Sequence, residues 1–278
     1  MTVPHHAATP VLQADPSLAR SAPIVLLHGA TSSARIWDEV VPAVGGAHQV
    51  LVPTLAGHLG GPALSVPPRD VVDGIVEAVA RYLDDTGIDV AHLVGNSLGG
   101  WVALELARRG RAASVLALSP AGAWRNARDL GRLLRLFRFG AFGARHATFI
   151  GRLVQRPGPR RVFMRPMAEH GDRMTSVQIE AALEDMAGCA ILTDLLSGAR
   201  DRGPIGRFER LDCPVRIAWG VEDKTLPFMR YGVPMVAAVP GAELTMVPGV
   251  GHVPMIDDPQ LVARMITEFV REVCDQDD

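Results

Sequence analysis

Short runs of apolar residues alternate with segments of helical spacing along most of the chain. The helical spacing is clearest where Val72, Ile75, Val76 and Val79 recur at intervals of three and four. A run that is apolar throughout is typical of a strand buried on both faces, and apolar residues at intervals of three and four are typical of a helix with one buried face. The pattern predicts a mostly parallel sheet flanked by helices, with strands at 24–27, 49–52, 90–94, 114–118, 215–219 and 244–247.

Local signals predict the ends of several elements. Asp70 is a candidate N-cap for the helix that follows it, and that helix is expected to end near Gly87. Apolar spacing within 36–41 predicts a helix directly after a glycine-bearing loop. Residues 1–21 are rich in Pro and Ala and predict a loose N-terminal arm, with one short edge strand near Val11.

The alternation of strands and helices stops after Gly122. Only helical patterns follow up to residue 210, and a strong one runs from Ser176 through Leu196. A long helical insertion between two strands predicts a cap over the strand ends. We therefore expect an N-terminal arm over 1–21, a core formed by 22–121 and 211–278, and a helical cap over 122–210.

Ser97 lies where an expected strand meets an expected helix, in the sequence Gly-Asn-Ser-Leu-Gly at 95–99. A very sharp strand-to-helix turn crowds the positions two before and two after its apex, so both require glycine. The turn exposes the serine hydroxyl, and the N-terminus of the following helix favours negative charge beside it. A serine hydroxyl is a poor nucleophile near neutral pH, so this site needs a histidine base and a carboxylate.

Asp223 and His252 follow the last two expected strands. Asp223 lies in the segment 220–227, directly after one strand, and His252 lies in the segment 248–254, directly after the next. Because parallel strands end at the same edge of a sheet, both side chains are expected beside the Ser97 turn. The chain thus supplies Ser, Asp and His in that order.

Composition and charge narrow the class of protein. The chain has 278 residues, 48% of them hydrophobic and 21% charged, which is typical of one globular domain with an insertion. A net charge of −2 gives no overall attraction to nucleic acid or to an anionic membrane. The three cysteines are far apart, and no stretch has the pattern of a signal peptide or a transmembrane helix, so a cytoplasmic protein is expected. No metal, nucleotide or flavin motif occurs, so no cofactor is expected.

Four motifs closely resemble those of the α/β-hydrolase family. They are HGA at 28–30, GNSLG at 95–99, GVEDKTLP at 220–227 and GHVPMIDDP at 251–259. The resemblance covers roughly residues 22–275 and implies the α/β-hydrolase fold, with a mostly parallel central sheet and a helical cap inserted between two strands.

The resemblance also implies the roles of individual residues. Ser97 is similar to the nucleophile of the family, His252 to the general base and later general acid, and Asp223 to the group that orients the imidazole. The oxyanion hole is expected to use the backbone N–H groups of Leu98 and Ala30. Thr31 is an alternative to Ala30.

Other carboxylates and histidines have alternative interpretations. Glu222 adjoins Asp223, but the Gly-x-x-Asp pattern of the family favours the later residue. Asp257 and Asp258 follow His252 too closely to be its partner and are expected to cap the terminal helix. The remaining histidines are expected to be structural, among them His28, His58 and His92.

A serine at this turn favours acyl transfer to water through an acyl-serine intermediate. The resemblance therefore implies a carboxylesterase-like serine hydrolase that cleaves a small to medium carboxylic ester, lactone or thioester. Epoxide hydrolases and haloalkane dehalogenases of the family carry aspartate at this position instead. Carbon–carbon (diketone) hydrolases usually carry Trp after the catalytic His, where Val253 stands here. That activity, a cofactor-free perhydrolase, and a non-catalytic small-ligand receptor that retains the triad stay open as alternatives.

The expected cap carries both arginines and apolar side chains. Arginines are frequent between Arg125 and Arg173, and they point either to an anionic substrate or, as we favour, to the solvated faces of amphipathic helices. The apolar residues are expected to form an underside that suits a hydrophobic acyl group. They are Leu133, Phe137, Phe139, Phe142, Phe149, Phe163, Met164, Met167 and Met186. The expected partner is a small hydrophobic acyl substrate, not nucleic acid or a membrane, and the oligomeric state, a homodimer included, stays open.

Overall fold

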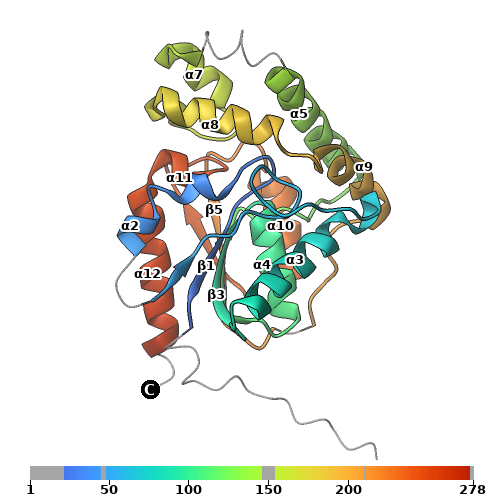
Figure 1. Cartoon of the computed structure of the whole chain (residues 1–278), viewed down its shortest axis with the longest axis vertical. Helices are drawn as coiled ribbons and strands as arrows, with labels where there is room; N and C mark the ends of the chain where they lie inside the picture. The colour runs from blue at the N-terminus through green and yellow to red at the C-terminus, as the bar shows by residue number, and fades with distance from the viewer. Residues whose placement is uncertain (1–21, 45–47, 146–153, 210, 276–278) are drawn as a thin grey trace, which may run out of the picture.

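The structure is a computed structural model that describes residues 22–44, 48–145, 154–209 and 211–275, with the backbone alone described for 139–145. The edge strand expected near Val11 lies outside the described residues, as does Phe149. Figure 1 shows a central sheet with helices on both of its faces and a further group of helices beyond one of its ends.

One parallel sheet forms the centre of the fold, with the strand order β2-β1-β3-β4-β5-β6. The strands are β1 (Ile24–Leu27), β2 (Val50–Leu51), β3 (Ala91–Asn96), β4 (Ala112–Leu118), β5 (Val215–Gly220) and β6 (Glu243–Val247). Each predicted strand is present, with ends that differ by at most two residues. In the register of the sheet, Gly95 lies beside both Leu27 and Ala117, so the carboxyl ends of the central strands meet at one edge.

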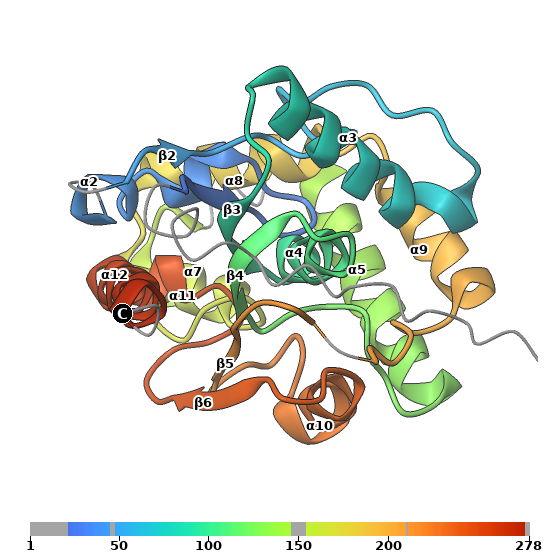
Figure 2. The ribbon, with the colours of Figure 1, turned by 90° about the horizontal axis from the view of Figure 1, so that it is seen from below.

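Helices cover both faces of the sheet. They are η1 (Ala34–Trp37), α2 (Val41–Val44), η2 (Pro68–Asp70), α3 (Val71–Asp85), α4 (Leu98–Arg108), α10 (Phe228–Ala238), α11 (Pro254–Asp257) and α12 (Pro259–Asp275). Alternate strand residues face opposite sides, so Val25 and Leu27 pack in one apolar cluster with α3, α4 and α10. Ile24 and Leu26 pack in a second cluster with α2 and α12. Figures 1 and 2 show these two groups of helices on opposite faces, which confirms the predicted fold class.

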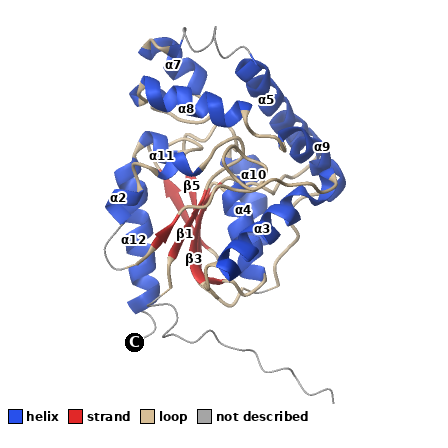
Figure 3. Cartoon of the chain, viewed as in Figure 1, coloured by secondary structure: helices blue, strands red, loops and turns tan. Residues whose placement is uncertain are grey.

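The helices between β4 and β5 lie beyond the carboxyl ends of the strands, as Figures 1 and 3 show. They are α5 (Ala127–Arg145), α7 (Pro157–Met164), η3 (Gly171–Arg173), α8 (Ser176–Ala187) and α9 (Leu192–Arg202). We call them the insert helices. Their position makes them neighbours of every loop that leaves the sheet at this edge.

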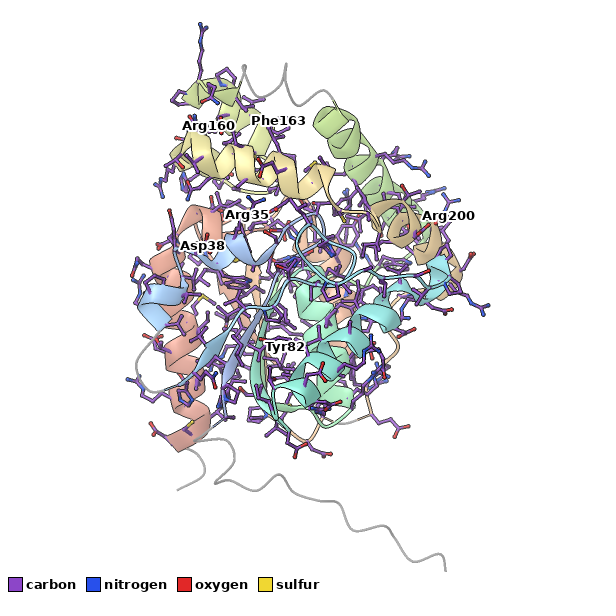
Figure 4. The ribbon with its side chains drawn as sticks, in the orientation of Figure 1. Arg35, Asp38, Tyr82, Arg160, Phe163 and Arg200 are labelled. Atoms are coloured by element: carbon purple, nitrogen blue, oxygen red, sulfur yellow. The ribbon has the colours of Figure 1, made fainter. Side chains whose placement is uncertain are left out.

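Asp185 of α8 joins the insert helices to the core. Its buried carboxylate accepts a hydrogen bond of 2.8 Å from the Ser33 hydroxyl and also pairs with the Arg35 guanidinium. Arg35 reaches Glu184 at 3.0 Å as well, and Figure 4 shows its side chain just below α8. A buried, doubly bonded carboxylate holds the loop after β1 and the underside of α8 together.

Three local predictions differ from the structure. The helix expected from Ser176 through Leu196 is two helices, because α8 ends at Ala187, with Gly188 as its C-cap, and the next turn donates the Ala190 N–H to a core carbonyl, Gly57 O, at 2.9 Å. The single helix expected over 36–41 is instead the two short helices η1 and α2. Asp70 lies at the start of α3 as predicted, but its side chain makes no capping hydrogen bond, because the turn of η2 leads directly into the helix.

Candidate active site

Ser97 occupies the sharp turn between β3 and α4. Its backbone has φ 55° and ψ −113°, a conformation that L-residues rarely adopt, and its side chain makes no capping hydrogen bond with α4. A Cβ at Gly95 would lie 2.2 Å from Gly99 O, and a Cβ at Gly99 would lie 2.2 Å from Leu27 O. The two glycines are therefore required by close backbone approach, and Ser97 lines a pocket at this end of the sheet.

Two backbone segments flank the Ser97 hydroxyl. Leu98 is the first residue of α4, so its N–H has no acceptor inside the helix and points along the positive end of the helix dipole. The loop after β1 lies against the turn on the other side, since a Cβ at Gly29 would be 3.3 Å from Ser97 Cβ. Ala30 and Leu98 both line the same pocket as Ser97, whereas Thr31 is not among its lining residues.

His252 and Asp223 are in direct contact on the neighbouring loops. His252 Nδ1 lies 2.8 Å from Asp223 Oδ2, and both side chains are buried. The other carboxylate oxygen, Oδ1, accepts the N–H of Leu226 at 2.7 Å. Because an ionised carboxylate can only accept, the proton of a neutral imidazole lies on Nδ1, and Nε2 is left as an acceptor.

Asn96 links the Ser97 turn to the His252 loop, a role that the sequence analysis did not identify. Its buried side-chain amide donates to His252 O at 2.8 Å and to Leu118 O at 3.1 Å. The residue directly before Ser97 is thus bonded to the backbone of His252. The available signal was a polar residue at the end of an otherwise apolar strand, where a buried amide needs partners.

The alternative carboxylates have other surroundings. Glu222 is half-buried, and its Oε2 has no hydrogen-bond partner within the described residues. Asp258 accepts the N–H of Leu261 at 2.8 Å and so caps α12 as expected. The same expectation is wrong for Asp257, whose carboxylate accepts the N–H of Gly251 at 2.7 Å and does not cap α12.

The other histidines near the site are held by structural contacts. His28 Nδ1 donates to Gly29 O at 2.8 Å, and its Nε2 accepts the N–H of Leu55 at 2.9 Å. Burial, together with the neighbouring His58, lowers the pKa of His28 to about 3. The two rings meet edge to face with centroids 4.9 Å apart, and burial lowers the pKa of His58 as well. His92 contacts the Ser114 hydroxyl at 2.8 Å within the sheet.

The pocket above Ser97 is walled by apolar side chains of the insert helices. The space between its atoms is about 560 Å³ when the part that is open to solvent is counted. Helix α5 contributes Leu130, Leu133, Leu134 and Phe137, and helix α9 contributes Leu195, Leu196 and Ala199. Trp101 and Trp124 complete the wall, and no charged side chain is among the described lining residues. The leucines of α9 were missed because their sequence pattern does not distinguish packing on the core from lining a pocket.

The predicted apolar underside is present only in part. Leu133 and Phe137 line the pocket, but Met164 packs with Phe163 and Met167 in a separate cluster between α7 and α8. Figure 4 shows Phe163 in this upper cluster, away from the sheet. Met186 is not among the described lining residues, and the side chains of Phe139 and Phe142 lie outside the described part of the structure.

Several arginines of the insert helices make structural contacts with protein groups, among them Arg202, which pairs with Asp73 of α3. Arg132 binds Asp129 at 2.9 Å, and the exposed Arg161 lies 3.6 Å from Glu169. Arg160 is buried, but its guanidinium donates to backbone carbonyls such as Val154 O, at 2.8 Å. These contacts support the interpretation of the arginines as structural and solvated groups.

Two further features are absent from the described residues. No group of His, Cys, Asp and Glu side chains there has the arrangement of a metal site. No helix in the same part of the chain is both long enough and apolar enough to cross a membrane.

The model of the alpha/beta hydrolase family matches residues 24–265, and the chain belongs to this family. An epoxide hydrolase of Mycobacterium tuberculosis is 33% identical over 203 residues, which cover 72% of this chain and 95% of that protein. A pimeloyl-[acyl-carrier protein] methyl ester esterase of Aromatoleum aromaticum is 25% identical over 255 residues, 89% of this chain and 98% of the relative. Among solved structures, a 2-hydroxy-6-oxo-6-phenylhexa-2,4-dienoate hydrolase from Rhodococcus has a TM-score of 0.71 and 22% identity, with 92% of each chain covered. The chain is therefore a hydrolase of this fold.

Proposed function

We propose that the protein is a serine hydrolase that cleaves carboxylic esters, and by the same chemistry lactones or thioesters, through an acyl-serine intermediate. The carrying observation is that Ser97 lies at a strained turn and lines an apolar pocket, and that Asn96, the residue before it, bonds to the backbone of His252, whose ring contacts Asp223 at 2.8 Å. The esterase relative supports an ester as the substrate.

In the proposed mechanism, His252 Nε2 takes the proton of Ser97 as its oxygen attacks the substrate carbonyl. The carbonyl oxygen becomes an oxyanion, which the N–H groups of Leu98 and Ala30 stabilise. The tetrahedral intermediate collapses, His252 gives its proton to the leaving alcohol or thiol, and an acyl-Ser97 ester remains. Water then attacks this ester with His252 again as base, which releases the acid and restores Ser97. Asp223 holds the imidazole and stabilises its protonated form in both halves.

We propose that residues 122–210, which contain the insert helices, form a cap over the pocket, and that this cap selects the acyl group. The wall made by α5 and α9 is apolar and uncharged, so desolvation favours a hydrophobic acyl chain over a carboxylate. Cys189 is buried and Cys213 is half-buried, and neither forms a disulfide, which fits a reducing compartment; we propose a cytoplasmic location.

Epoxide hydrolysis is a second candidate, because one relative is an epoxide hydrolase. Attack of Ser97 on an epoxide would form an ether, which has no carbonyl for water to attack, so the cycle would stop after one event. Catalysis would instead require His252 to activate water directly, with the ring oxygen taking up the proton. Such a reaction would survive the loss of the Ser97 hydroxyl.

The test is hydrolysis of a chromogenic ester series of increasing acyl length by the wild type and Ser97→Ala, with covalent labelling by a serine-directed phosphonate. Turnover and labelling in the wild type, both abolished in the variant, would support the acyl-serine mechanism. Epoxide turnover that persists in Ser97→Ala would favour the second candidate. A folded wild type with neither labelling nor turnover on esters, thioesters, diketones or epoxides would refute the proposed enzymatic activity. A small-ligand receptor that retains the triad would then be the favoured function.

A further inference from the structure

One segment of the insert, residues 166–170, touches both loops that carry the acid and the base. Thr225, two residues after Asp223, donates its hydroxyl to Pro166 O at 2.6 Å. On the other loop, the N–H of Val253 donates to Met167 O at 2.8 Å. We call residues 166–170 the brace.

Asp257 bonds the brace to the His252 loop with a single carboxylate. Its Oδ2 accepts the N–H of Gly251 at 2.7 Å and that of Glu169 at 3.2 Å. Its Oδ1 accepts the N–H of His170 at 2.6 Å. The side chain is 3% exposed, so these charge-assisted bonds form away from solvent and replace its hydration.

The brace and the His252 loop are also in tight steric contact. A Cβ at Gly251 would lie 3.1 Å from both Ala168 Cα and Glu169 N. On the opposite side, the Asn96 amide holds His252 O at 2.8 Å. The backbone around His252 is therefore fixed by the side chain of Asn96 at the end of β3 and by that of Asp257 in α11, which also holds the brace.

Resting on the proposed function, we propose that Asp257 is a positioning residue that couples the placement of the insert over the pocket to the placement of the His252 imidazole. It reaches neither the pocket lining nor His252 itself, and it acts through the two backbones that it joins. A brace that shifts would carry the Gly251 peptide with it, and the His252 ring would move relative to Ser97.

The negative charge is essential to this role. The carboxylate receives three N–H donors, and an asparagine offers only one oxygen, while its amide nitrogen would face a donor. Asp257→Asn therefore loses at least one of these three hydrogen bonds, and sets an N–H donor against an N–H donor, at nearly constant volume. Asp258→Asn is the matched control, since the adjacent carboxylate only caps α12 through the N–H of Leu261.

The experiment compares the wild type, Asp257→Asn and Asp258→Asn by ester kinetics across pH, phosphonate labelling rate and hydrogen exchange. For Asp257→Asn we expect kcat and the labelling rate to fall by about 10²-fold with KM changed by less than about threefold, because misplacement of a catalytic group by about 1 Å has effects of this size. We also expect exchange to rise in both 166–170 and 250–254 but not in 95–100. Asp258→Asn should leave all of these unchanged, and it should lower Tm little because asparagine caps a helix about as well as aspartate does.

Kinetic losses of similar size in the two variants would overturn the positioning role, as would faster exchange in only one of the two segments. If Asp257→Asn does not fold, Gly251→Ala tests the same contact, because its Cβ pushes on the brace; unchanged kcat there would also refute the proposal. A wild type without ester turnover would refute the proposed function alone, since the exchange comparison reads the coupling without any substrate.

Discussion

His252 and Asp223 lie 29 positions apart in the chain, and their side chains meet at 2.8 Å. The Asp223 carboxylate uses one oxygen for this contact and the other for the N–H of Leu226 at 2.7 Å, so its orientation is fixed from two sides. A carboxylate held in this way stabilises a protonated imidazole more than a neutral one. The contact therefore supports Asp223, rather than its neighbour Glu222, as the partner of the base.

Asp223→Asn should lower kcat for ester hydrolysis by about 10⁴-fold, because the amide would favour the wrong tautomer of His252. Glu222→Gln should lower it by less than about tenfold, since Glu222 does not contact His252. Steady-state kinetics of the two variants at one pH make the comparison. The reverse order of losses would reassign the acid to Glu222.

Ser97→Gly should make the protein more stable than Ser97→Ala, by about 1 kcal/mol. A side chain at φ 55° and ψ −113° strains the backbone, and only glycine removes that strain. Both variants lack the hydroxyl, so both should lose on the order of 10⁶ in kcat. Urea unfolding measures the difference in the free energy of unfolding. Equal stability of the two variants would contradict the strain that the turn carries.

Phe137→Ala should shift the preferred ester towards longer or bulkier acyl groups. The ring lines the pocket, and its removal enlarges the space opposite Ser97. The measurement is kcat/KM over the ester series. Phe163→Ala removes the same group from the cluster between α7 and α8, so it should lower stability without altering the order of preference. If only Phe163→Ala changed the order of preference among the esters, the acyl group would bind at the cluster between α7 and α8 and not in the pocket that Phe137 lines.

Acid should destabilise the protein through His28. Burial lowers the pKa of this imidazole from 6.5 to about 3, so the folded protein keeps it neutral while the unfolded chain protonates it below about pH 6.5. The unfolded state thus binds more protons between about pH 6.5 and 3, and the free energy of unfolding falls as the pH falls, by at most about 1.4 kcal/mol per unit. Urea unfolding at several pH values, with His28→Asn beside the wild type, isolates this contribution. An identical pH slope in the variant would argue against it.

Local signals in the sequence were sufficient for much of the fold. The apolar runs identified the strands, because a strand buried on both faces must be apolar along its whole length. The glycines around Ser97 identified the turn, because no other residue fits the backbone contacts at Gly95 and Gly99. The order of the chain put Asp223 and His252 on loops at the same edge of the sheet.

Other features depended on contacts between segments far apart in the chain. The expected helix over 176–196 breaks near Gly188 because the backbone there bonds to Gly57, more than 120 residues away in the sequence. Residue spacing reports the propensity of a segment, and it carries no information on which distant carbonyl will compete for its N–H groups.

The sequence by itself thus determined the parallel sheet, the turn at Ser97 and the candidate residues Asp223 and His252, since each depends on local backbone geometry or on chain order. Only the tertiary structure decided which leucines of α5 and α9 wall the pocket and that Asn96 holds the His252 backbone. It also separated Asp257, which joins two distant segments, from Asp258, which caps a helix. Adjacent carboxylates are equivalent in sequence, and the N–H groups that surround them after folding make them different.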